Sequence, residues 1–152
     1  MSALPGHVAV TNLLYRYAEL IDAGDYEGIG VLLAHAVITT DGSSDEIAGA
    51  TAVTRMYERS TRKYPDGTPR SKHVITNPIV EVDEDAGTAT CRSYYTVLQQ
   101  TDHLPLQSII TGRYRDEFTR VDGVWRYTRR HMAVDQVGDL SQHLLFELPP
   151  RD

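Results

Sequence analysis

The sequence predicts an α+β domain in which three N-terminal helices pack on a curved, mostly antiparallel sheet and enclose a cone-shaped hollow. The hydrophobic period changes once along the chain, from three- and four-residue steps in the first half to alternation in the second. Short polar turns divide the alternating half into long segments, which is typical of an antiparallel meander. With 152 residues, of which 41% are hydrophobic, the chain is long enough for one such domain.

An amphipathic helix is expected from about Pro5 to Asp22, because apolar side chains recur there on one face. This stripe consists of Val10, Leu14, Tyr17, Ala18 and Ile21. Gly24 ends the helix, and Asp25 is suited to cap a second, short helix that runs to about Ala34. The two helices should form a tight hairpin.

A third helix is expected from about Ala48 to Tyr64, after an extended piece over residues 35–40 and a polar turn over residues 41–45. A turn over residues 65–67, with the sequence Pro-Asp-Gly, ends this helix. Its apolar side carries Val53, Met56 and Tyr57.

The second half of the chain predicts long strands joined by short turns. The expected strands cover residues 71–82, 88–101, 106–121 and 124–134. We expect one domain over residues 1–145 and a C-terminal tail over residues 146–152.

Composition limits the kinds of partner. The formal net charge is −6 and the sequence has no basic stripe, which argues against nucleic acid and against a membrane surface. Cys91 is the only cysteine, and the N-terminus has neither a basic segment nor a long apolar run, so we expect a cytoplasmic protein. The sequence has no metal-ligand spacing and no glycine-rich phosphate loop, so we expect neither a metal nor a cofactor. The expected partner is a small hydrophobic ligand or substrate.

The candidate chemistry lies in two residues about fifty positions apart. Asp22 ends the first helix, and His73 lies near the start of the first long strand. Alone, either residue has an ordinary structural use, since aspartate often stabilises turns. If the fold brings them together, they form a carboxylate-oriented imidazole, which is a general acid and base for moving a carbon-bound proton.

Five short motifs, taken in order, resemble the SnoaL-like branch of the nuclear-transport-factor-2-like (NTF2-like) superfamily. They are LYRYAELIDAGDY at residues 14–26, KHVITN at 72–77, GRYRD at 112–116, DGVWR at 122–126 and GDLS at 138–141. The resemblance covers nearly the whole chain and implies the fold described above. The superfamily includes scytalone dehydratase, bile-acid 7α-dehydratase, ketosteroid isomerase, polyketide cyclases and non-catalytic small subunits of ring-hydroxylating dioxygenases. The fold alone therefore does not select an activity.

The resemblance to the dehydratase-like members implies roles for particular residues. Asp22 would orient His73, and Tyr17, five residues before the aspartate, would polarise a substrate oxygen. Ideal helix geometry instead favours Tyr15 as the neighbour of Asp22, because seven residues return the chain to nearly the same face. Both tyrosines therefore remain candidates, with Tyr17 preferred on family grounds.

Alternation along the last strand suggests an inward arginine. The face that carries Trp125 should be the covered one, and strict alternation puts Arg129 on that face. Arg129 would match the family's anion-stabilising arginine, and Arg130 is the alternative.

The middle strand departs from the dehydratase pattern. Where those relatives carry a second acid or histidine, residues 93–96 read Ser-Tyr-Tyr-Thr. A tyrosine is a weak acid, with a reference pKa of about 10. Tyr95 would equally suit an isomerase or cyclase that stabilises an enolate with a phenol.

These observations together predict a small lyase or isomerase of the dehydratase type, acting on a hydrophobic, oxygenated ring compound. The expected catalytic residues are Asp22, His73, Tyr17 and Arg129. The expected substrate-binding residues are Tyr15, Val53, Met56, Tyr57, Val74, Asn77, Tyr95 and Trp125.

The alternative is a non-catalytic ligand-binding or assembly subunit of the same fold. In either case we expect a homodimer or homotrimer formed through the open face of the sheet. An enzyme predicts Asp22 and His73 in contact at the bottom of a concave apolar pocket. A binding module predicts a filled or absent pocket and a large apolar outer face.

Overall fold

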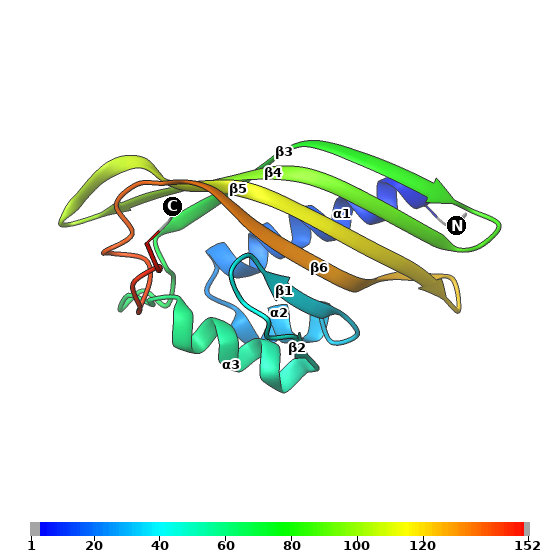
Figure 1. Cartoon of the computed structure of the whole chain (residues 1–152), viewed down its shortest axis with the longest axis horizontal. Coiled ribbons are helices and arrows are strands. Elements are labelled where there is room, and N and C mark those ends of the chain that lie inside the picture. The colour runs from blue at the N-terminus through cyan, green and yellow to red at the C-terminus, as the bar shows by residue number, and fades with distance from the viewer. Residues whose placement is uncertain (1–3, 151–152) are drawn as a thin grey trace.

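The computed structural model describes residues 4–150 and has the expected α+β architecture (Figure 1). The ends of two predicted ranges, residues 1–3 of the domain and 151–152 of the tail, lie outside the described residues. The helices are α1 (Gly6–Asp22), α2 (Tyr26–Leu32) and α3 (Ala50–Ser60). The strands are β1 (Val37–Thr40), β2 (Ile47–Ala48), β3 (Ser71–Asp83), β4 (Thr88–Thr101), β5 (Leu104–Val121) and β6 (Val124–Val137).

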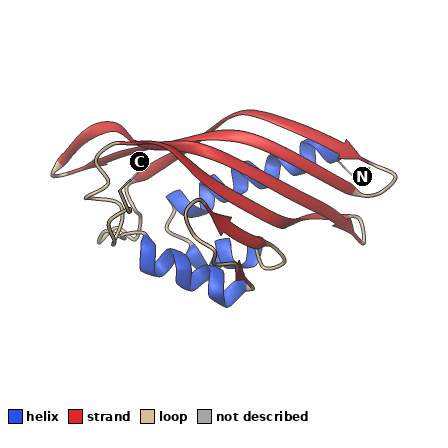
Figure 2. Ribbon diagram, in the orientation of Figure 1, coloured by secondary structure: helices blue, strands red, loops and turns tan. Residues whose placement is uncertain are grey.

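The strands form a six-stranded sheet in the order β2-β1-β6-β5-β4-β3. β1 runs parallel to β6, and the other neighbouring pairs are antiparallel. The helices lie on one side of this curved sheet, and its other face is open (Figure 2). The fold prediction is therefore confirmed, although the two-residue strand β2 was not expected from the sequence.

The connection between α1 and α2 explains where the first helix ends. Gly24 has a φ of +71°, and a Cβ there would lie 2.1 Å from the carbonyl oxygen of Gly67, so only glycine fits. Asp25 then caps α2, because its side chain accepts a hydrogen bond of 2.8 Å from the Gly28 N–H. This turn leaves Asp22 at the C-terminal end of α1.

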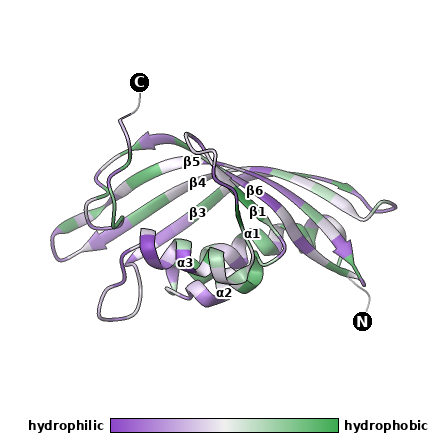
Figure 3. Cartoon of the chain, turned by 60° about the horizontal axis from the view of Figure 1, so that its bottom comes forward, coloured by the Kyte–Doolittle hydropathy of each residue, from purple (hydrophilic) through white to green (hydrophobic). Residues whose placement is uncertain are grey.

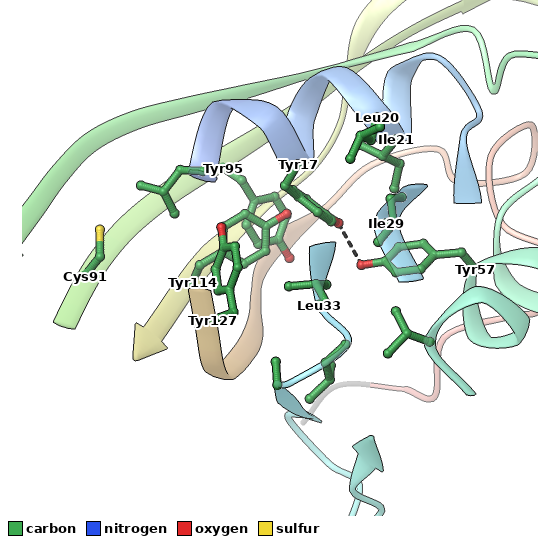
Figure 4. Packing of buried hydrophobic residues seen from close by; sticks show 14 of the residues in the cluster. Tyr17, Leu20, Ile21, Ile29, Leu33, Tyr57, Cys91, Tyr95, Tyr114 and Tyr127 are labelled. Atoms are coloured by element: carbon green, nitrogen blue, oxygen red, sulfur yellow. Dashed lines mark hydrogen bonds between the residues drawn. The ribbon is translucent and has the colours of Figure 1, made fainter. Parts of the chain in front are cut away.

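The core lies between the helices and the covered face of the sheet. Apolar and polar residues alternate along the strands, which is the pattern of a sheet covered on one face (Figure 3). The centre of this core is rich in tyrosine; the buried rings are Tyr17, Tyr57, Tyr95, Tyr114 and Tyr127 (Figure 4). The ring of Tyr26 is also buried. Among the described residues, none of the helices is long and apolar enough to cross a lipid bilayer.

Candidate active site

The structure brings Asp22 and His73 into direct contact. The His73 Nδ1 atom lies 2.7 Å from Asp22 Oδ1, and the His73 backbone N–H donates to both carboxylate oxygens at 2.9 and 3.1 Å. The two side chains are 11% and 5% exposed for Asp22 and His73, respectively. Through these bonds the carboxylate also ties the end of α1 to β3, which is an edge strand of the sheet.

The hydrogen bonds assign the state of the imidazole. A carboxylate can only accept, so Nδ1 of His73 carries the proton that it donates to Asp22. Nε2 is then the basic nitrogen, and it has no hydrogen-bond partner among residues 4–150. The pair therefore has the form of an oriented general base.

Tyr17 lies next to this pair, inside the core. Its ring meets the His73 ring edge-on, with the centroids 6.2 Å apart. Its hydroxyl lies 2.9 Å from the hydroxyl of Tyr57 (Figure 4). Burial and then the neighbouring Tyr17 raise the pKa of Tyr57 well above its usual value, so this phenol stays protonated. Tyr15 is 44% exposed and is not part of this buried cluster, so its predicted role in binding stays a prediction.

A buried ion pair lies beneath the same tyrosine. Arg130 Nε and Nη2 donate to the two carboxylate oxygens of Asp116 at 2.8 and 2.9 Å, and both side chains are 0% exposed. The guanidinium also lies 4.4, 4.0 and 5.0 Å from the ring centroids of Tyr17, Tyr114 and Tyr127. Its third nitrogen, Nη1, is buried and has no partner among the described residues.

Burial acts on both members of the ion pair. It raises the pKa of the Asp116 carboxyl, and the bond from Arg130 opposes this rise. Burial lowers the pKa of Arg130, but the charge and hydrogen bond of Asp116, together with Tyr127 and Tyr114, outweigh burial and keep that pKa well above its usual value. The guanidinium is thus a fixed positive charge in the interior.

The prediction that Arg129 points inward is wrong, because β6 contains a bulge. The register of β6 slips between Tyr127 and Arg129, where Thr128 is an extra residue. The extra residue reverses the alternation, so Arg130 faces the interior and Arg129 is exposed on the outer face. A strict two-residue period cannot reveal this change.

Three other predicted binding residues lie in or beside the core. Val53 is fully buried on α3, and Met56 packs against the core from the same helix. The Tyr95 hydroxyl donates to the Ala133 carbonyl oxygen at 2.9 Å, and its ring stacks on Tyr114 at 4.5 Å. These side chains support the tyrosine cluster.

Three others lie away from the site. Val74 is 40% exposed, because it points to the opposite face from His73. Asn77 has a φ of +42° at a second bulge, and it lines a hollow on the outer face. Trp125 lies against Gly6 at the start of α1, roughly 24 Å along that helix from its last residue. These three side chains therefore lie away from the dyad, and their predicted role in substrate binding stays a prediction.

Five hollows on residues 4–150 lie away from the dyad, above which an apolar hollow was expected. A hollow of about 570 Å³ lies near the β3–β4 turn, and one of about 430 Å³ lies on the outer face. Two more flank the C-terminal segment, and none of these linings includes Asp22 or His73. The low exposure of both side chains agrees with a nearly closed interior.

A second histidine near the dyad was missed from the sequence. His143 follows β6 and is 5% exposed, with its ring centroid 6.3 Å from that of His73. Burial and then the proximity of His73 lower the pKa of His143 to about 4. No periodicity could find this residue, because the segment that carries it is neither helix nor strand.

The assembled groups suit proton transfer next to a polarised oxygen. Nε2 of His73 can take a proton, and the phenol of Tyr57 and the Arg130 guanidinium can stabilise negative charge on oxygen. Within residues 4–150, no three histidine, cysteine or acidic side chains gather closely enough to hold a metal ion.

Comparison with known proteins agrees with this fold. A Mycobacterium tuberculosis protein of unknown function is 25% identical with a TM-score of 0.69, over 86% of this chain and 72% of that one. A Nostoc punctiforme protein with a cystatin-like fold is 18% identical with a TM-score of 0.71, over 91% and 99% of the two chains. A Novosphingobium aromaticivorans protein named as a candidate scytalone dehydratase is 19% identical with a TM-score of 0.68, over 88% and 86%.

No curated protein matches the sequence. The profile of the SnoaL-like domain, in contrast, matches residues 2–131, which is most of the chain. This protein therefore belongs to the SnoaL-like family.

Proposed function

We propose that this protein is a small, cofactor-independent lyase or isomerase that moves a carbon-bound proton on a hydrophobic, oxygenated ring compound of the polyketide, steroid or terpenoid kind. The observation that carries the proposal is the 2.7 Å contact between His73 Nδ1 and Asp22, which leaves Nε2 without a protein partner among the described residues. Nε2 removes the proton, while Asp22 holds the ring and stabilises the imidazolium.

The groups around Tyr17 support an oxygenated substrate. Loss of a proton next to a carbonyl moves negative charge onto its oxygen, which then needs donors. Tyr57 remains a protonated phenol, and Nη1 of Arg130 is a buried donor without an acceptor among residues 4–150. We therefore assign the anion-stabilising role to Arg130 in place of Arg129, with the Tyr17–Tyr57 hydroxyl pair beside it.

The protonated His73 must return its proton to complete a cycle. Return to a leaving hydroxyl, with loss of water, gives dehydration. Return to another carbon gives isomerisation. The structural relative named as a candidate scytalone dehydratase favours the first course, and the absence of an acidic residue at positions 93–96 on β4 favours the second.

The test is deuterium exchange in heavy water. Wild type would be incubated with a panel of hydroxylated and keto ring compounds, and loss of each carbon-bound proton followed by NMR. For a compound that exchanges, His73→Gln should slow exchange by about 10²–10⁴-fold. His103→Gln is the matched control, because His103 is exposed on the β4–β5 turn. Equal rates in wild type and His73→Gln would contradict the proposal.

A non-catalytic binding or assembly subunit is the second candidate, and the closed interior favours it. The outer face gives it a surface: Arg92 and Arg115 are register neighbours on β4 and β5, and neither forms an ion pair within the described part of the chain. Like charges in register repel, so a partner copy that supplies carboxylates would stabilise this face. This candidate predicts a dimer or trimer in sedimentation experiments and no exchange of any panel compound.

A further inference from the structure

The segment after β6 packs against the end of α3 (Figure 1). The Arg62 N–H donates to the His143 carbonyl oxygen at 2.8 Å, and the Leu145 N–H donates to the Ser60 carbonyl oxygen at 3.0 Å. These two bonds pair the segment with the chain that leaves α3. They flank Leu144 and hold the backbone of the segment at His143 and Leu145.

The same segment is also held by the sheet and by the loop after α3. The Gln142 carbonyl oxygen accepts from the Tyr64 hydroxyl at 2.5 Å and from Gln99 Nε2 at 3.0 Å. Gln99 is a nearly fully buried residue of β4. The residue before His143 is therefore fixed to both layers of the domain, which directs the imidazole into the interior.

The His143 side chain carries a buried polar atom that nothing on the described chain satisfies. Its Nδ1 has no hydrogen-bond partner among residues 4–150, although the residue is 95% buried. The ionisable groups that act on it are His73 and Asp22. A buried nitrogen without a partner costs free energy, so its retention beside the dyad points to a partner that arrives with a ligand.

We propose that His143 is a second polar group of the site and that its Nδ1 hydrogen-bonds an oxygen of the ligand on which His73 acts. This inference rests on the proposed function of His73. It assigns a binding role to the C-terminal segment, which lies outside the helices and strands of the domain. It also names the ligand chemistry: a flat ring with a hydroxyl group that lies beside His143.

Two probes of similar shape separate hydrogen bonding from packing. 2-Naphthol has a hydroxyl where 2-methylnaphthalene has a methyl group, and binding of both can be followed by naphthalene fluorescence. His143→Leu should weaken 2-naphthol binding by about three- to tenfold and leave 2-methylnaphthalene binding unchanged. His143→Gln, which keeps a donor and an acceptor, should recover part of the loss. His103→Gln should bind both probes as wild type does.

Thermal unfolding of each variant checks the fold, and His143→Phe replaces the leucine variant in the comparison if that variant does not fold. An equal loss for both probes, no loss for 2-naphthol, or no binding of 2-naphthol to wild type would overturn the inference. Deuterium exchange in His73→Gln separates this result from the proposed function. If exchange needs His73 but probe selectivity does not depend on His143, only the inference falls. If exchange does not need His73 but probe selectivity depends on His143, the proposed function falls and only the binding role of His143 remains.

Discussion

The Asp22–His73 pair lies where the end of α1 meets the edge strand β3, whereas the Asp116–Arg130 pair lies between β5 and β6 inside the sheet. Their shortest contacts are nearly equal, at 2.7 and 2.8 Å. The first pair retains slight exposure and a nitrogen without a protein partner among residues 4–150, and the second is completely buried. Depth therefore separates a pair suited to exchange protons from one that supplies a permanent charge.

The largest expected difference between the pairs is in stability. Arg130→Met leaves the Asp116 charge buried without a counter-ion, so the free energy of unfolding should fall by about 3–5 kcal/mol. Arg113→Met is the matched control, since it removes a pair with Asp135 whose side chains are 42% and 39% exposed. That control should cost at most about 1 kcal/mol. Urea unfolding measures both, and similar losses would break the distinction by depth.

Acid should lower the free energy of unfolding by protonating His143, the neighbour of the dyad. The pKa of His143 is about 4 in the folded protein and about 6.5 when unfolded, so the unfolded chain takes up the proton first as pH falls. The neutral His143 side chain contributes about 3 kcal/mol to the free energy of unfolding above pH 6.5. This contribution is lost as the pH falls toward 4.

Chemical unfolding at pH 7 and pH 4.5 measures this loss. His143→Gln should show a flatter dependence on pH than wild type, whereas His103→Gln should follow wild type. If the free energy of unfolding of His143→Gln depends on pH as strongly as that of wild type, His143 is not the group that titrates beside the dyad.

The smallest expected effect on stability belongs to Asp22. In Asp22→Asn the amide oxygen can still accept the His73 N–H, so unfolding should cost only about 1–2 kcal/mol less free energy than in wild type. Proton exchange on a panel compound should nevertheless fall strongly, because the imidazolium loses its counter-charge. A stability loss as large as that of Arg130→Met would mean that this aspartate is chiefly structural.

Much of the fold followed from local patterns. The stripe from Val10 to Ile21 predicted α1 to within one residue, and alternation predicted the four long strands. Gly24 and Asp25 marked the turn that leaves Asp22 at the helix end. These features depend on neighbours in the sequence, which explains why they could be predicted.

The candidate site could be predicted only in part. Asp22 and His73 were named because each sits at the end of a recognisable element and matches a family motif. Tyr17 and Tyr15 could not be separated by spacing, and burial separates them. Arg129 was chosen by a strict alternation that the bulge at Thr128 breaks.

Local sequence thus specified the helices and the four long strands, because periodicity and turn chemistry act over a few neighbouring residues, and a family motif singled out the two residues of the dyad. Contacts between distant segments determined which arginine is buried and brought His143 to His73. A bulge depends on how two strands pair, and the position of the C-terminal segment depends on hydrogen bonds to α3 and β4. Such long-range pairings leave no period in the sequence, so they could be read only from the folded chain.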